Sequence, residues 1–561
     1  MPRRVHVAFL AAGVLLALAH PSPRANAADT PGFLVLAPDR GSWGNEEIHE
    51  IFAAYRPRVP IAELAFVTHR SAARRIREGL ERLRQQGVTR AVAIPLFFSA
   101  AEERHRRARV LLGVEPPAAG DDRPLTPFLP VTLAPPFAES FLATEVLRDR
   151  LTALGGSADR LILLGYGAAS ADQAARIEED LRRVQRPLHK DFPFREVQTA
   201  VLFDHQTAPE AKSLWRHRAV ALLKDAARSA GRTMVVPLFL GWKADPMMSA
   251  WRQVQREVDG QGLVFDGQDL SHREVLVTWL LNASNRHLPV RRDEVGVVIL
   301  SHGADLDWND EIRSTFRGLD SRYLIEYDFS MAHPQTLSSA IGRLERRGAR
   351  FIVVLLAFAL EQTFRGQVAQ VLGLTGPEGQ AGHASHSGSG EPAHGGTARP
   401  LRSGARFAIA GGVEDSPLFA RVLLDRARES SRDPGRETVI LVGHGAGDDG
   451  LDRHWHHVLA SLASQMRQMG GAEFREIRWG TWREDWPEKR GQAVQRIREM
   501  VQEAGRDGGR ALIVDARVNG PGPGDRFLAG LDYANNSRGF APHPTLKRWA
   551  EEKIEGALRA R

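Results

Sequence analysis

The sequence predicts an α/β protein of tandem three-layer α/β/α modules, each with a mostly parallel sheet of about four strands. Two observations predict this fold. Apolar runs of strand length alternate with helical segments, which is typical of parallel sheets covered on both faces. Strand–turn–helix openings also recur, and a third-strand phrase, GVTRAVAIPLFF, has a counterpart in GARFIVVLLAFA. Repetition at domain-scale spacing indicates copies of one unit.

Residues 1–28 are predicted to be a secretory signal peptide and not part of the fold. Arg3 and Arg4 give a positive start, residues 7–19 are apolar, and residues 25–27 form a small-x-small cleavage site. The alternative is an uncleaved membrane anchor, but an apolar segment of about 13 residues is short for a bilayer span. We therefore expect an exported, periplasmic protein with no stable membrane span after cleavage.

The first module, residues 31–155, shows the order of the unit. A strand and a helix lead to a second strand, which is followed by a long amphipathic helix, two further strands and a closing helix. Apart from the first helix, these elements are predicted at 33–36, 61–67, 72–86, 91–98, 131–133 and 138–154.

The remaining modules are predicted at 158–290, 293–431 and 436–561. The second has corresponding phrases at 161–168 and 234–240, and the fourth at 438–447 and 511–518. The third repeats the first closely. Its elements are predicted at 295–300, 323–328, 336–347, 351–358, 406–410 and 417–430. Linkers group the modules into an N-terminal pair, residues 31–290, and a C-terminal pair, residues 293–561.

The composition limits the chemistry. The chain is 43% hydrophobic and 25% charged, which is ordinary for a globular protein, and it contains no cysteine. Any metal must therefore be held by histidine or carboxylate. The net charge of +7 is spread over arginines that lie beside glutamates, without an aromatic-basic motif. We therefore expect no nucleic-acid partner.

Two of the four modules carry a histidine directly after the first strand. These are His302 in the third module and His444 in the fourth, whereas the second has Tyr166 and the first has Pro38 and Asp39. Open parallel sheets bind ligands at the carboxyl ends of their strands. His302 and His444 are therefore predicted to lie at a ligand-binding edge.

Another histidine follows the second strand in three modules, as His69, His205 and His333. This point also belongs to the carboxyl edge, so His333 is predicted to face the same cleft as His302. Glu361, after the third strand, would add a carboxylate to a metal site. The alternative is that each of these histidines caps the helix that follows it.

An insertion at 376–404 is rich in Gly, Ser, Pro and His and lacks the apolar residues needed to fold. Its three histidines, His383, His386 and His394, either collect a divalent metal or belong to a loop without a function. In the fourth module, His454 and His457 are spaced to share a helix face, where a solvated surface is the alternative. His543 lies at the start of the last helix, where a structural role is expected.

Together these motifs resemble the CbiX-type class II chelatases, the superfamily of sirohydrochlorin cobaltochelatase and ferrochelatase. The Gly-His-Gly-Ser-like turn of that family is matched at 301–304 and 443–446. Its Val-Val-Pro-Leu-Phe-Leu-like third strand is matched at 94–98 and 236–240. The resemblance covers nearly the whole mature chain as four divergent modules.

The resemblance implies a lyase-class chelatase of cobalamin biosynthesis, with catalytic histidines at His302 and His444. These residues would bind a divalent ion (cobalt, nickel, iron or zinc) as substrate and assist proton removal from a tetrapyrrole. The second family histidine, expected about eight residues past the proline of the third strand, has no clear match. Glu102 and His105 lie near that point in the first module.

Two functions therefore remain open. The first is sirohydrochlorin cobaltochelatase-like insertion of a metal into a tetrapyrrole. The second is an exported, non-catalytic metal- or tetrapyrrole-binding protein built from degenerate modules. A purely structural or partner-binding array is a third interpretation.

Overall fold

The computed structural model describes residues 29–560 except 120, 127–128, 205–206, 230, 241–244, 259–262, 267–272 and 375–398, and only the backbone of 245–251. The predicted signal peptide and His205, His383, His386 and His394 lie outside the described residues. Within the described part of the chain, no helix is long and apolar enough to cross a membrane.

Four separate sheets, each of four parallel strands, form the framework. Their orders are β2-β1-β3-β4, β6-β5-β7-β8, β10-β9-β11-β12 and β14-β13-β15-β16, so the first strand of each module is central. This confirms the predicted fold class. The strands are β1 (Pro31–Pro38), β2 (Ala62–Val67), β3 (Arg90–Pro95), β4 (Val131–Leu133), β5 (Arg160–Ala168), β6 (Glu196–Phe203), β7 (Thr233–Pro237), β8 (Leu263–Phe265), β9 (Val295–Leu300), β10 (Leu324–Asp328), β11 (Phe351–Leu356), β12 (Arg406–Gly411), β13 (Glu437–Gly443), β14 (Glu476–Thr481), β15 (Arg510–Asp515) and β16 (Ala534–Asn535).

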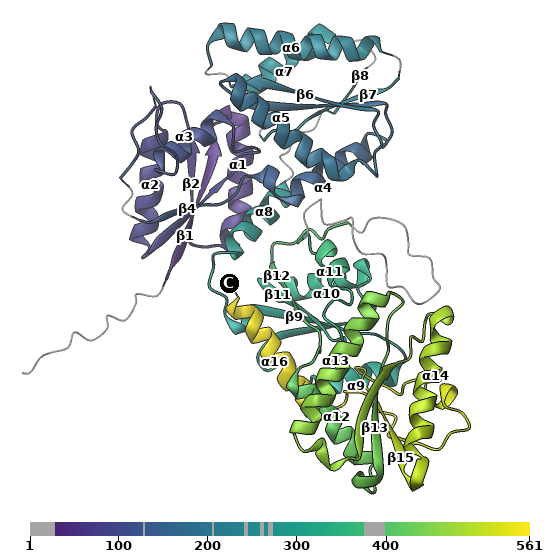
Figure 1. Ribbon diagram of the computed structural model, residues 1–561. Coiled ribbons are helices and arrows are strands. Elements are labelled where there is room, and N and C mark those ends of the chain that lie inside the picture. The colour runs from purple at the N-terminus through teal and green to yellow at the C-terminus, as the bar shows by residue number, and fades with distance from the viewer. Residues whose placement is uncertain are drawn as a thin grey trace, which may run out of the picture.

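Helices cover both faces of the sheets, as α5 and α6 do for the second sheet and α13 and α14 for the fourth (Figure 1). The helices are α1 (Gly41–Tyr55), α2 (Ala72–Gln85), α3 (Glu103–Leu111), α4 (Phe141–Ala153), α5 (Ala171–Gln185), α6 (Pro209–Arg228), α7 (Asp245–Val258), α8 (Arg273–Asn285), α9 (Leu306–Thr315), α10 (Pro334–Arg346), α11 (Arg365–Val371), α12 (Pro417–Ser430), α13 (Asp449–Gln468), α14 (Pro487–Ala504), α15 (Gly524–Phe527) and α16 (Pro544–Arg559).

The amphipathic pattern explains why such helices form and dock. In α2 the apolar residues Ile76, Leu80 and Leu83 recur at helical spacing and are buried against the first sheet, while the arginines between them face solvent. The third strands end earlier than predicted, at Pro95 and Leu356. Their apolar runs continue because the following residues stay buried after the chain has left the sheet.

The modules of each pair share one core. A single cluster of buried apolar residues joins the first and second modules, and another joins the third and fourth. The closing helices are exchanged within each pair, since α4 packs on α5 and α8 on α1, while α12 packs on α13 and α16 on β11 and β12. The module bounds remain a prediction, because each closing helix packs on the partner module.

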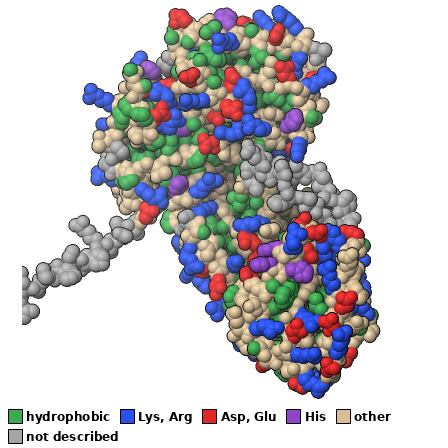
Figure 2. All heavy atoms as spheres, viewed as in Figure 1, with side chains coloured by type: hydrophobic (Ala, Val, Ile, Leu, Met, Phe, Trp, Pro, Cys, Tyr) green, Lys and Arg blue, Asp and Glu red, His purple; other side chains and the backbone are tan. Residues whose placement is uncertain are grey.

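Acidic and basic side chains are interspersed over both pairs on the face shown in Figure 2. Several ion pairs of the chain join neighbours on one helix, such as Arg74 and Glu78, whose side chains are 3.0 Å apart. Exposed pairs of this kind contribute little to stability.

Candidate metal site

Strand register gives a common frame for the four modules. In each module, the first strand pairs with the third strand up to one last residue. In modules one to four this residue is Leu36, Leu164, Leu300 and Val442, respectively. The residues two positions further on are Pro38, Tyr166, His302 and His444. Both histidines therefore follow the central strand of their sheet at its carboxyl edge.

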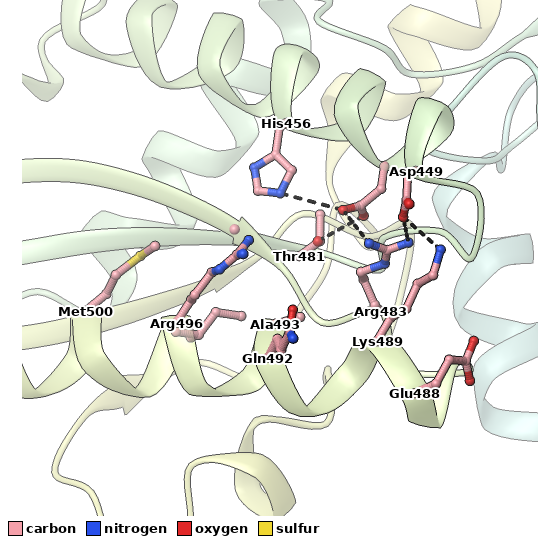
Figure 3. Close-up of a pocket in the computed structure, with 13 residues that line it drawn as sticks. Asp449, His456, Thr481, Arg483, Glu488, Lys489, Gln492, Ala493, Arg496 and Met500 are labelled. Atoms are coloured by element: carbon pink, nitrogen blue, oxygen red, sulfur yellow. Dashed lines mark hydrogen bonds and ion pairs between the residues drawn. The ribbon is translucent and has the colours of Figure 1, made fainter.

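Two cationic side chains donate hydrogen bonds to the loop that carries His444. Arg483 donates to the carbonyl oxygens of Ala446 and Gly447 at 2.7 and 3.0 Å, and Lys489 donates to that of Gly447 at 2.6 Å. Both cations also pair with Asp449. They line a cavity of about 360 Å³ between α13 and α14 (Figure 3). These contacts fix the backbone from which the His444 ring projects.

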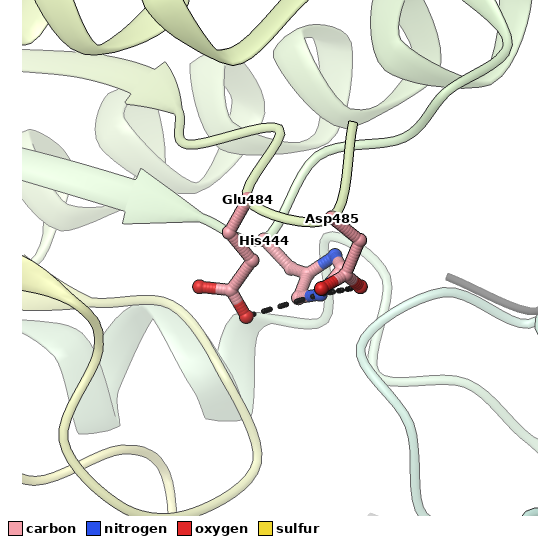
Figure 4. Close-up of side chains that lie close together, drawn as sticks. All are labelled: His444, Glu484 and Asp485. Atoms are coloured by element: carbon pink, nitrogen blue, oxygen red, sulfur yellow. Dashed lines mark ion pairs between the residues drawn. The ribbon is translucent and has the colours of Figure 1, made fainter. Parts of the chain in front are cut away.

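The His444 ring lies between two carboxylates (Figure 4). Its Nε2 atom is 3.1 Å from Glu484 Oε1 and 3.1 Å from Asp485 Oδ2. Its Nδ1 atom is 3.0 Å from the carbonyl oxygen of Gly445, and the Trp486 ring meets it edge-on at 5.8 Å. Among the described residues, this is the one group of three potential metal ligands whose donor atoms all lie within 4.8 Å of one another.

The two carboxylates were missed by the sequence reasoning, although a signal for them exists. In the third sheet Leu300 pairs with Asp328, and in the fourth Val442 pairs with Gly480. Five residues beyond each second-strand partner lie His333 and Asp485, so Asp485 occupies the place of the recurring histidine. The recurring residue at this position was expected to be histidine. An acidic residue at the same offset marks the same edge.

The carboxylates stabilise the charged form of the imidazole. Desolvation opposes protonation of His444, but hydrogen bonds with Asp485 and Glu484 outweigh it and raise the pKa of His444 to about 9. Desolvation likewise opposes ionisation of Glu484, yet His444 and Arg517 lower the pKa of Glu484 to about 2. The imidazole is therefore protonated at neutral pH, with Nε2 directed at the two carboxylates.

This charge predicts a pH dependence of stability. Because the folded-state pKa of His444 lies above its ordinary value of 6.5, the imidazolium stabilises the fold fully below about pH 6.5 and loses this effect as pH rises through about 9. With a chelator present, the melting temperature of His444→Gln should lie below that of the wild type at pH 6, and the gap should close by pH 10. A gap that stays constant over this range would contradict the charge assignment.

His302 faces the same space from the third module. Its side chain is exposed and its ring centroid is 5.9 Å from that of Trp308. Desolvation lowers the pKa of His302, and the charges of Arg517 and His444 in the fourth module lower it further. Trp308 lies against the backbone of Gly520, where a side chain would find no room. The carboxyl edges of the two modules therefore meet around His302 and His444.

Within the described residues, two other predicted ligands, His333 and Glu361, are not part of this group of three. His333 is exposed at the start of α10, and its backbone N–H donates to Ser330. Glu361 pairs with Arg365 at 2.7 Å. Their assignment as metal ligands remains a prediction.

Three further histidines noted in the sequence, His454, His457 and His543, have other partners or face solvent. His454 Nε2 is 2.9 Å from Glu414, a contact between the third and fourth modules, and His457 is exposed. His543 caps α16 by accepting from the backbone N–H of Thr545, as expected for a structural residue.

The corresponding edges of the N-terminal pair are closed by buried ion pairs. Arg40 pairs with Glu102 at 3.3 Å, and Arg104 pairs with Asp204 of the second module at 3.1 Å. All four side chains are buried, and Arg40 also lies over the ring of Tyr166, at the position of His444. In the N-terminal pair these contacts join the carboxyl edges of the two sheets. At the equivalent edges of the C-terminal pair lie His302 and His444.

His105, near the place of the missing family histidine, is a buried core residue of the first module. Its ring stacks on Phe97, and desolvation lowers the pKa of His105 to about 4. Its Nδ1 atom lies 3.3 Å from the carbonyl oxygen of Ser99. It is therefore neutral and packed inside its own module.

Comparison with known proteins gives one family match, to the CbiX model over residues 37–153. Two structures of SirB from Bacillus subtilis are similar. The one with Fe3+ has 15% identity and a TM-score of 0.32, over 46% of this chain and 97% of its own. The other, from subspecies spizizenii, is a sirohydrochlorin chelatase in complex with cobalt, with 14% identity and a TM-score of 0.30 over 44% and 90%.

A third similar structure is DR2241 from Deinococcus radiodurans, described as a multi-domain protein with structural similarity to chelatases and two additional novel domains. It has 16% identity and a TM-score of 0.30, over 47% of this chain and 56% of its own. A search of curated proteins found no match. These TM-scores are too low to assign the chemistry of the similar structures to this chain, so its function is inferred from its own residues.

Proposed function

We propose that this chain, whose residues 37–153 match the CbiX family model, is a metal-chelatase-like protein that binds a divalent ion at His444, Glu484 and Asp485. We further propose that it inserts the ion, as substrate, into a tetrapyrrole held between the third and fourth modules. Cobalt is the proposed metal, as in sirohydrochlorin cobaltochelatases. The export signal expected at residues 1–28 would make this an activity outside the cytoplasm.

The observation that supports this proposal most strongly is the convergence of one imidazole and two carboxylates in the His444 group. Three protein ligands suit a divalent ion and leave coordination positions open for a substrate. Two carboxylates also balance the charge of the ion. Since His444 must release its proton to bind a metal, the affinity should rise with pH up to about 9.

The surroundings suit a flat ligand that releases protons. Insertion of a divalent ion into a tetrapyrrole displaces two pyrrole protons, which need an acceptor. The lowered pKa of His302 leaves its imidazole neutral at neutral pH and able to accept one. Trp308 and Trp486 lie beside the two histidines, and Leu306 is 71% exposed at the start of α9. These apolar surfaces would contact the face of a macrocycle.

A second candidate is metal or tetrapyrrole binding without turnover. It is favoured by the ion-paired edges of the N-terminal pair, where two of the four modules lack an open site. It is also favoured by the fourth module itself, in which the loop after the third strand offers no histidine. In this case the His444 group would keep its ion and not deliver it.

The absorbance spectrum of sirohydrochlorin with added cobalt separates the two candidates. The chelatase proposal predicts insertion faster than the uncatalysed rate, loss of this acceleration in His444→Ala, and a reduced rate in His302→Ala. His457→Ala is a matched control, because this histidine is exposed on α13, and it should keep the wild-type rate. Cobalt binding without acceleration would leave only the binding function.

A further inference from the structure

A second cavity lies between the N-terminal pair and the C-terminal pair. Its volume is about 990 Å³, and its lining includes Arg90, the first residue of β3, and Arg406, the first residue of β12. The segment that follows α8 in the N-terminal pair contributes Arg286 and His287. The groove therefore lies at the amino ends of these strands, the opposite edge of the third sheet from His302.

The charged side chains that line this groove are mostly positive. Three arginines, Arg90, Arg286 and Arg406, line it together with one acid, Asp29, which pairs with Arg90 at 2.9 Å. Desolvation lowers the pKa of His287, and the charges of all three arginines lower it further. The positive potential of the three arginines therefore extends into the groove at His287. A ligand with several negative charges would be attracted to it.

The remainder of the lining is largely apolar. It includes Phe141 from the N-terminal pair and Leu372, Leu374 and Phe407 from the C-terminal pair. Leu374 is 50% exposed. Phe141 lies against Gly373 so closely that a side chain there would clash, which makes the wall a packed junction of the two pairs. The lining of the groove thus combines apolar and cationic side chains.

We propose that this groove is a second ligand site, for a large polycarboxylate with a flat apolar body. Ligand pockets usually measure about 300–1,000 Å³, so this one is at the upper end of the range and suits a macrocycle. Charge and shape specify the class of ligand, whereas the choice of a tetrapyrrole rests on the proposed function. The groove would hold a macrocycle apart from the metal site, before or after insertion.

Equilibrium dialysis of the full chain with uroporphyrin, an octacarboxylate porphyrin, tests this site in the presence of a chelator. The wild type should bind porphyrin in the groove, and Arg286→Glu should weaken that binding at least tenfold. Arg286 is exposed, so the variant should fold. Arg77→Glu, an exposed arginine on α2, is the matched control and should bind as the wild type does.

The same titration distinguishes the two sites. If Arg286→Glu removes one of two bound porphyrins, or the only one, the groove is a macrocycle site, even if cobalt insertion at His444 fails. Unchanged binding in Arg286→Glu, or an equal loss in Arg77→Glu, would overturn this inference. Neither result would affect the metal site proposed at His444, Glu484 and Asp485. Porphyrin binding that appears only after deletion of residues 376–398 would also overturn it, because that segment would then be the occupant.

Discussion

Replacing His444 with alanine is expected to weaken divalent-metal binding at least about 100-fold. The substitution removes the one imidazole of the group and leaves Glu484 and Asp485, whose charges Arg517 and solvent then compensate. Loss of a partner outside the ligand shell alone typically costs 10–100-fold in affinity, so loss of a ligand should cost more. Isothermal titration of the purified chain with cobalt at pH 8 measures the effect.

Two further variants make that titration specific. His302→Ala should weaken binding less than His444→Ala, because His302 lies across from the group of three and not within it. Deletion of residues 376–398 should lower the number of bound ions if His383, His386 and His394 collect metal, and should leave the high-affinity class unchanged. Equal affinities in the wild type and His444→Ala would remove His444 from the metal site.

Substitution of Glu102 by alanine is expected to destabilise the N-terminal pair by about 3–5 kcal/mol. The change leaves the guanidinium of Arg40, which is 2% exposed, without its ion-pair partner, and an uncompensated buried charge costs about this much. It also removes the acceptor for the backbone N–H groups of Phe98 and Ser99. Urea denaturation followed by circular dichroism measures the loss.

The matched control is Glu78→Ala, which breaks an exposed pair with Arg74 on α2. It should cost less than about 1 kcal/mol. Cobalt affinity at His444 should be the same in both variants, because that site lies in the other pair. A loss at Glu102 as small as at Glu78 would show that the edges of the N-terminal pair are not held by this ion pair.

Much of the framework follows from local pattern alone. The strands at 131–133 and 295–300 and the helix at 417–430 are observed at their predicted bounds. They were predictable because apolar runs end at polar turns, and Pro417 fits the first turn of a helix. The exchange of closing helices was not, since the apolar face of α4 or α16 does not specify which module it covers.

The histidines of the site were predictable from the sequence, but its two carboxylates were not. His444 and His302 follow central strands, and position in a parallel sheet predicts their edge. Glu484 and Asp485 lie in the loop after an edge strand, where acidic residues are common and only strand register singles them out. The closure of the N-terminal edges depends on contacts such as Arg104 with Asp204, 100 residues apart, which no local pattern encodes.

The location of bound cobalt tests the central claim most directly. Crystals of the full chain soaked in cobalt and measured near its absorption edge should show the strongest anomalous peak beside His444 Nε2, within ligand distance of Glu484 and Asp485. No such peak should occur at Arg40 and Glu102 in the N-terminal pair. A strongest peak elsewhere, or an empty His444 group in crystals that bind cobalt, would contradict the account.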